Sequence, residues 1–304
     1  MNNKECIQLV ISKTEEYKAA YKTNNYVEVS AINETVLNSL SAVDMIPKNK
    51  ADNLKNNELT FSLGNNKIGA DTLCINVSTA LNCPSDILGL CNNCKICYAK
   101  SHNKRYFKNT VPKNLINQII FNKVVTGDIT AEDVADNLIK AVKKGTTKKQ
   151  FKNLLFLRLN VEGDIADNTV LSAVDKVMGI IVDRLSLLCC YSYSHNRFLD
   201  FNKADNIVFN TSDFKKDNIK SCQVIYEITA EVRQKILNKE VILCNGDCNN
   251  CSYCKNKADK RQILFLAHGG IFKGLSAVDS ELLDFINCQK VTDYKRFIEG
   301  ATSD

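Results

Sequence analysis

The chain has 304 residues, of which 44% are hydrophobic, and its formal net charge is +6. This length and composition predict a globular protein with one large domain or two smaller ones, and they exclude a disordered or fibrous chain. No apolar stretch approaches the roughly 18 to 20 residues that span a bilayer, which excludes a membrane protein. The modest positive charge permits a nucleic-acid partner without requiring one.

Cysteine is the outlier of the composition, with 14 residues alongside no Trp and only 3 Pro. Dense disulfide frameworks are typical of short secreted chains, whereas this chain is long and shows no signal peptide. The thiols therefore indicate a reducing compartment, and we expect the protein to be cytoplasmic.

The two ends of the chain are predicted to be helical. Residues 1–57 are rich in Lys, Glu and Asn, and their apolar periodicity predicts helices over 4–21 and 27–43. We expect a helical N-terminal extension over 1–57, an α/β core over 58–275 and a polar, helical C-terminal tail over 276–304.

Between these ends, short buried strands alternate with amphipathic helices. Strands are predicted at 73–77, 153–160, 185–193, 206–210, 222–228 and 263–267. Helices are predicted at 113–125, 131–144, 168–183 and 230–237. This alternation predicts an α/β fold with a mainly parallel sheet of about six strands.

Eight of the cysteines gather in two groups. Four within fifteen residues form the first group, at Cys83, Cys91, Cys94 and Cys97. Four more form the second group, at Cys244, Cys248, Cys251 and Cys254. Thiolates two or three residues apart can face one metal ion or one iron–sulfur cube, whereas a disulfide between such neighbours is strained and closes almost no loop. Both groups are therefore predicted to bind metal.

A basic and aromatic run, residues 100–108, follows the first group directly. Such a run is typical of a solvated helix face, and an anion-binding strip is the alternative.

Polar residues follow the buried strands where ligands collect in parallel α/β sheets, at the carboxyl ends. The candidates for binding a cofactor or substrate are Arg158, Asn160, Asp164, Tyr193, His195, Ser212 and His268. Glu162, Tyr191 and Asn210 occupy similar positions.

Arg158 is the sharpest of these candidates, because a guanidinium inside an apolar strand must find a carboxylate, phosphate or carbonyl partner. The alternative to a ligand is an internal salt bridge to Asp164 or Glu227. His195 and His268 can ligate a metal or transfer a proton, with an ordinary hydrogen bond as the alternative.

The order of these motifs resembles the phage and mobile-element "gene product 88" family. The matching elements are Asn82-Cys83-Pro84, Cys97-Tyr98-Ala99, Arg158 with Gly163-Asp164, Tyr191-Ser192-Tyr193-Ser194, the second cysteine group and a strand that ends in His268. The resemblance covers roughly residues 59–270. It implies an iron–sulfur protein of phage, prophage or plasmid origin on a partial (βα) barrel, distantly related to radical SAM enzymes.

The chain departs from the radical SAM pattern in its cysteine spacing. The usual Cys-x3-Cys-x2-Cys loop after the first strand is absent, and Ile96 stands where an aromatic residue precedes the last cysteine. The second group has that spacing, but it follows the later strands and carries Asn250 at the aromatic position. No Gly-Gly-Glu sequence is present, so SAM binding is only a secondary hypothesis.

Two functions are compatible with these patterns. The leading hypothesis is an iron–sulfur protein with one or two [4Fe-4S] clusters in a redox or structural role, acting with an unknown small molecule or redox partner. The alternative is a zinc-binding protein that interacts with nucleic acid through its basic strips. The sequence leaves open whether the protein is an enzyme.

Overall fold

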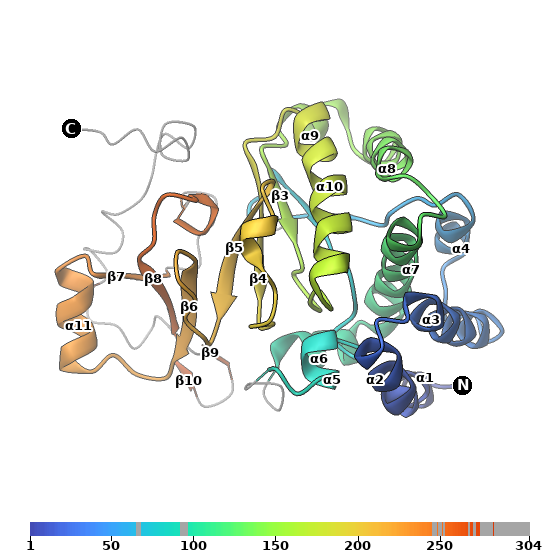
Figure 1. Ribbon diagram of the computed structural model, residues 1–304, viewed down its shortest axis with the longest axis horizontal. Helices are drawn as coiled ribbons and strands as arrows, with labels where there is room; N and C mark the ends of the chain where they lie inside the picture. Colours follow the sequence, from blue (N-terminus) through green and yellow to red (C-terminus); the bar gives the residue numbers. More distant parts are fainter. Residues whose placement is uncertain are drawn as a thin grey trace.

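The computed structural model describes residues 1–64, 68–91, 97–244, 248, 251, 253–266, 268–269, 272–273 and 282. Within these residues the chain forms an eight-stranded, mostly parallel sheet covered by helices, so the predicted α/β class is confirmed (Figure 1). None of the helices in this part of the chain combines the length and apolarity needed to cross a membrane.

The strands of the main sheet follow the order β1-β2-β3-β4-β5-β6-β8-β7. Their bounds are β1 (Ser62–Leu63), β2 (Thr72–Ile75), β3 (Phe156–Leu159), β4 (Cys189–Ser194), β5 (Ile207–Ser212), β6 (Lys220–Ile225), β7 (Val241–Leu243) and β8 (Gln262–Leu266). Only β1 runs antiparallel to its neighbour. A separate antiparallel pair joins β9 (His268–Gly269) to β10 (Phe272–Lys273). From β2 to β6, each strand therefore lies beside the strand that precedes it in the chain.

The sequence pattern predicts only about six strands. It misses β1 and β7 because they have two and three residues, too few to show an alternating pattern. The six predicted strands correspond to β2, β3, β4, β5, β6 and β8.

The helices before β3 are α1 (Asn3–Ser12), α2 (Thr14–Lys22), α3 (Tyr26–Ser41), α4 (Lys48–Lys55), α5 (Pro84–Ile87), α6 (Tyr98–Arg105), α7 (Phe107–Thr126), α8 (Ala131–Gly145) and α9 (Lys148–Lys152). Two more follow, α10 (Asn168–Arg184) and α11 (Ala230–Leu237). All four helices predicted in the core are present, as α7, α8, α10 and α11. Local caps fix their starts: the Asp167 carboxylate accepts the N–H groups of Thr169 and Val170 at the beginning of α10.

The two faces of the sheet have different neighbours. Side chains such as Leu157, Cys190 and Phe209 point into the main hydrophobic core, which they share with α7, α8 and α10. The residues that alternate with them, including Phe156 and Tyr191, belong to a separate cluster that contains Cys254. One face therefore packs on helices, and the other faces the second group of cysteines.

The N-terminal helices pack against this core. Helix α3 lies along α7, and α1 to α4 gather beyond it, away from β7 and α11 (Figure 1). Cys6, Val36 and Leu40 are fully buried members of the main hydrophobic cluster. The predicted helices at 4–21 and 27–43 are confirmed, with a break at Lys13. The proposed boundaries at 57 and 275 stay predictions.

We expect Leu40→Ala to lower the free energy of unfolding of the whole chain by about 2–5 kcal/mol, because it empties a fully buried site between α3 and the core. Urea unfolding followed by circular dichroism measures this effect. Val27→Ala is the matched control in the same helix, since Val27 is 66% exposed. A separate early transition in Leu40→Ala, with the main one unchanged, would contradict the shared core.

Candidate metal-binding site

The described residues of the second cysteine segment (residues 244–254) include Cys244 and Cys254, which pack on the sheet face opposite α7, α8 and α10. The segment's 3₁₀ turn η4 (Tyr253–Lys255) contacts β4 and β5. Cys244 and Cys254 pack with Ile242 and Ile263 in one hydrophobic cluster. The Cys254 end of the segment therefore lies over the middle of the sheet, whereas Cys244 directly follows the edge strand β7.

Three side chains hold this segment in place, one each from β5, β6 and η4. The Asn210 amide donates to the carbonyl of Cys254 at 3.0 Å. The Lys220 ammonium donates to the carbonyl of Asn256 at 2.9 Å and also to the carbonyl of Tyr253. The Lys255 ammonium lies 3.6 Å from the centre of the Phe156 ring. The backbone around Cys254 is therefore fixed by hydrogen bonds from buried polar groups.

Positive charge is concentrated beneath the segment. Lys220 is 3% exposed and Lys255 is 2% exposed, and burial lowers the pKa of both. Arg158 points to the same face, with its guanidinium carbon 5.3 Å from the ring centre of Tyr193 and 6.0 Å from that of Tyr191. Burying cations is costly unless negative charge lies nearby.

The same face contains polar atoms without hydrogen bonds. Arg158 Nε, the Tyr191 hydroxyl and Asn210 Oδ1 are buried and have no hydrogen-bond partner in the described part of the chain. Tyr191 is 2% exposed and Asn210 is fully buried. Buried polar atoms are nearly always satisfied in folded proteins, so this concentration indicates a binding position.

The thiols of the segment influence one another. Burial, together with the neighbouring Cys254 and Cys248 thiols, raises the pKa of Cys251 to about 12. Cys251 and Cys254 are free thiols. Among the described side chains, no group of three or more His, Cys, Asp or Glu is arranged so that it can hold a metal ion. The segment gathers its thiols on one face, and the ligation predicted from their spacing stays a prediction.

The described residues of the first cysteine segment (residues 83–97), namely 83–91 and 97, include neighbours of Asp164 and His195, which follow the carboxyl ends of β3 and β4. Cys83 is the N-cap residue of α5, and its backbone carbonyl accepts the N–H groups of Asp86 at 3.1 Å and Ile87 at 3.0 Å. Burial raises the pKa of Cys83 well above its usual value, with smaller contributions from Asp164 and Cys97. Cys94 lies outside the described residues.

Asp164 connects this segment to the sheet. Its buried carboxylate accepts the Ser85 hydroxyl at 2.6 Å, the Ser194 hydroxyl at 2.8 Å and the His195 backbone N–H at 2.9 Å. The Asp164 carboxylate thus binds Ser85, Ser194 and His195 instead of Arg158. Glu227 is exposed to solvent. Arg158 pairs with no described carboxylate, so the salt bridge suggested as its alternative role is wrong.

His195 lies beside the first cysteine segment. Burial acts to lower its pKa, but a hydrogen bond with Cys91 and the carboxylates of Asp164 and Asp213 raise it. Its Nδ1 atom is 3.6 Å from the Asp213 carboxylate. His195, Ser212 and Asp213 line one small hollow with Leu90. The fold therefore brings together His195 and Ser212, two of the residues predicted to lie at strand ends.

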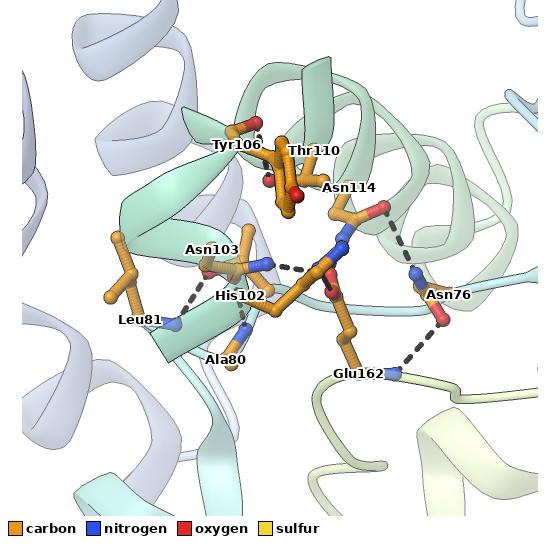
Figure 2. A network of polar contacts seen from close by, with 10 residues as sticks. Asn76, Ala80, Leu81, His102, Asn103, Tyr106, Thr110, Asn114 and Glu162 are labelled. Carbon is orange, nitrogen blue, oxygen red and sulfur yellow. Dashed lines mark hydrogen bonds and ion pairs between the residues drawn. The ribbon is translucent and has the colours of Figure 1, made fainter. Parts of the chain in front are cut away.

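Glu162 has a structural role at the same edge (Figure 2). Its buried carboxylate accepts the Asn103 amide at 2.6 Å and the Asn114 amide at 3.1 Å, and it pairs with His102. Its own N–H donates to Asn76 at 3.2 Å. These contacts fix α6, the helix that begins directly after Cys97.

The remaining candidates behave differently. Arg158 and Tyr193 lie within strands, on the face below the second cysteine segment, instead of at the strand ends. Asn160 adopts a positive φ of 56°, and its side chain accepts the N–H of Val77, which is a turn-forming role. His268 belongs to β9, and its side chain lies outside the described residues. Sequence reasoning missed Lys220 and Lys255, although a lysine directly after Cys254 was a visible signal.

Comparisons with protein-family models, curated proteins and solved structures found no match to this chain. The resemblance to the phage "gene product 88" family therefore stays a prediction.

We expect Gly163→Ala to destabilise the turn that positions Asp164. Gly163 has a φ of +76°, and an added Cβ would lie 2.3 Å from the Ser78 hydroxyl and 2.4 Å from its carbonyl oxygen. Gly127→Ala is the matched control, because its φ is +82° and its Cβ would meet no atom within 4 Å.

The control should lose about 1–2 kcal/mol of unfolding free energy from its backbone conformation alone. Gly163→Ala should lose about 1–3 kcal/mol more from the clash. Urea midpoints of the two variants make the comparison, and equal losses would show that Ser78 moves away without cost.

Proposed function

We propose that this chain is an iron–sulfur protein of the phage "gene product 88" type. In this proposal the second group of cysteines holds one [4Fe-4S] cluster against the open face of the sheet, and the first group holds another. The observation that supports it most is the positive charge around the second cysteine segment, which comes from the buried Lys220 and Lys255 and the half-buried Arg158.

Charge balance is the physical reason. Cysteines ligate metals as thiolates, so four of them around an iron–sulfur core give a centre with net negative charge. A cluster in this position would be neutralised by Lys220 and Lys255, which lie beside Cys254, and by Arg158, which is close enough to Cys248 for each charge to affect the other. The carboxylates of Asp71 and Asp259 also act on Lys255 and Lys220, so a cluster would add to negative charge that is already present there.

Hydrogen-bond donors support the same assignment. The Tyr191 hydroxyl and Arg158 Nε are buried donors without described acceptors on that face. Cluster sulfurs and thiolates accept hydrogen bonds, and such bonds tune the reduction potential.

The strand order favours the barrel-like topology implied by the resemblance. Parallel strands β2 to β6 lie in sequence order, and the core of one face is shared with α7, α8 and α10. Parallel crossovers are nearly always right-handed, and an unreversed strand order keeps their helices on one face, as in (βα) barrels. In this arrangement the second cysteine segment would occupy the interior side. A reducing compartment such as the cytoplasm would keep its thiols available.

We expect protein purified without oxygen to be brown, with iron, acid-labile sulfide and broad absorption at about 400 nm. Cys251→Ala should remove the second centre, and Cys94→Ala the first. Cys6→Ala is the control, because Cys6 is buried in the helical core apart from both groups. Colourless protein containing zinc would support the zinc alternative, and full iron content in both ligand variants would refute the ligand assignment.

We expect Arg158→Gln to make the reduction potential of the second centre more negative, because it removes a positive charge that favours the reduced, more anionic state. Arg158→Lys keeps the charge and should stay closer to the original value. Redox titration monitored by electron paramagnetic resonance measures both, in the Cys94→Ala background so that only the second centre contributes. An unchanged potential in Arg158→Gln would place Arg158 away from the centre.

A further inference from the structure

Helix α6 carries an aromatic strip that is open to solvent. We define the strip as Tyr98, His102 and Tyr106, which are four residues apart and follow one face of the helix. Tyr98 is 65% exposed and Tyr106 is 47% exposed. Consecutive ring centres lie 6.2 and 4.9 Å apart. Large aromatic rings exposed side by side are unusual on a soluble surface and mark interaction sites.

The surroundings of the strip are basic. Between Asp86 and Asp128 the sequence contains no acidic residue and seven Lys or Arg residues. Three of them, Lys104, Arg105 and Lys108, are exposed beside the strip and form no ion pair with a described carboxylate. A polyanion is therefore the partner that the local charge favours.

The strip is held in a fixed position. His102 pairs with the buried carboxylate of Glu162, and Asn103 donates to the same carboxylate at 2.6 Å, as Figure 2 shows. Asn3 of α1 donates to the carbonyl of Lys104 at 3.0 Å. Because the backbone and the central ring are anchored, binding would cost little conformational entropy.

We propose that the aromatic strip and its three neighbouring basic residues bind single-stranded nucleic acid. Unpaired bases offer π-faces that stack on tyrosine rings, while Lys and Arg contact the phosphates. A duplex hides those faces, so the tyrosines would add nothing to its binding. The strip begins at Tyr98, directly after Cys97, but it contains none of the eight grouped cysteines, so this proposal does not depend on which metal they bind.

The test uses fluorescence anisotropy of the full chain with a labelled oligothymidylate of about 15 nucleotides at about 50 mM salt. The double variant Tyr98→Ala/Tyr106→Ala should bind at least about tenfold more weakly. Tyr98→Phe/Tyr106→Phe keeps the rings and should bind like the original chain. A duplex of equal length should bind more weakly, and its affinity should be the same for the original chain and both tyrosine variants. Oligouridylate tests whether RNA is preferred to DNA.

A second comparison tests whether the basic residues beside the strip contribute more to binding than basic residues elsewhere on the surface. Lys104→Ala/Arg105→Ala/Lys108→Ala should weaken binding and reduce the salt slope by about two. The matched control is Lys144→Ala/Lys148→Ala/Lys149→Ala, which removes three exposed lysines from a region without exposed aromatic side chains and should leave binding nearly unchanged. Equal losses in both triple variants, or tyrosine variants that bind like the original chain, would overturn the proposal.

Discussion

The burial of positive charge beneath the second cysteine segment is the constraint on which the proposed function depends. Lys220 and Lys255 are almost completely buried, and Arg158 lies over two tyrosine rings on the same face of the sheet. Each lysine also holds the backbone of the segment through a carbonyl. The same side chains thus position the cysteines and supply the charge that a thiolate centre needs, which links the local fold to the chemistry.

The two cysteine segments are held by different parts of one sheet. Asp164, in the loop between β3 and α10, binds the first segment through Ser85, whereas Asn210 in β5 binds the second through Cys254. Arg158 lies on the face below the second segment, beside Tyr191 and Tyr193, and its charge acts to lower the pKa of Tyr98, the neighbour of Cys97.

Periodicity predicted the long elements well, because α7, α8 and α10 and the strands beneath them bury continuous apolar faces. It failed for β7, whose three residues gain their stability from pairing with β8. The cysteine spacing identified the two segments, but it could not show that one lies at the strand ends and the other across the sheet face. The salt bridge offered as the alternative role of Arg158 is wrong, since Asp164, which is near in sequence, is already hydrogen-bonded to Ser85 and Ser194. Such long-range pairings are decided by packing, which local patterns do not contain.

The N-terminal helices contribute to the first cysteine segment as well as to the core. Asn82, the residue before Cys83, is fully buried and donates to Gln118 of α7 at 2.7 Å and to Asn33 of α3 at 3.3 Å. Tyr17 and Tyr21 of α2 complete this network through hydrogen bonds to Asn33 and Gln118. A buried amide network of this kind is costly unless every member is satisfied, so it fixes one arrangement of its members. Helices α2 and α3 therefore determine where Cys83 lies, and the position of a candidate ligand depends on residues that the sequence pattern assigned to an extension.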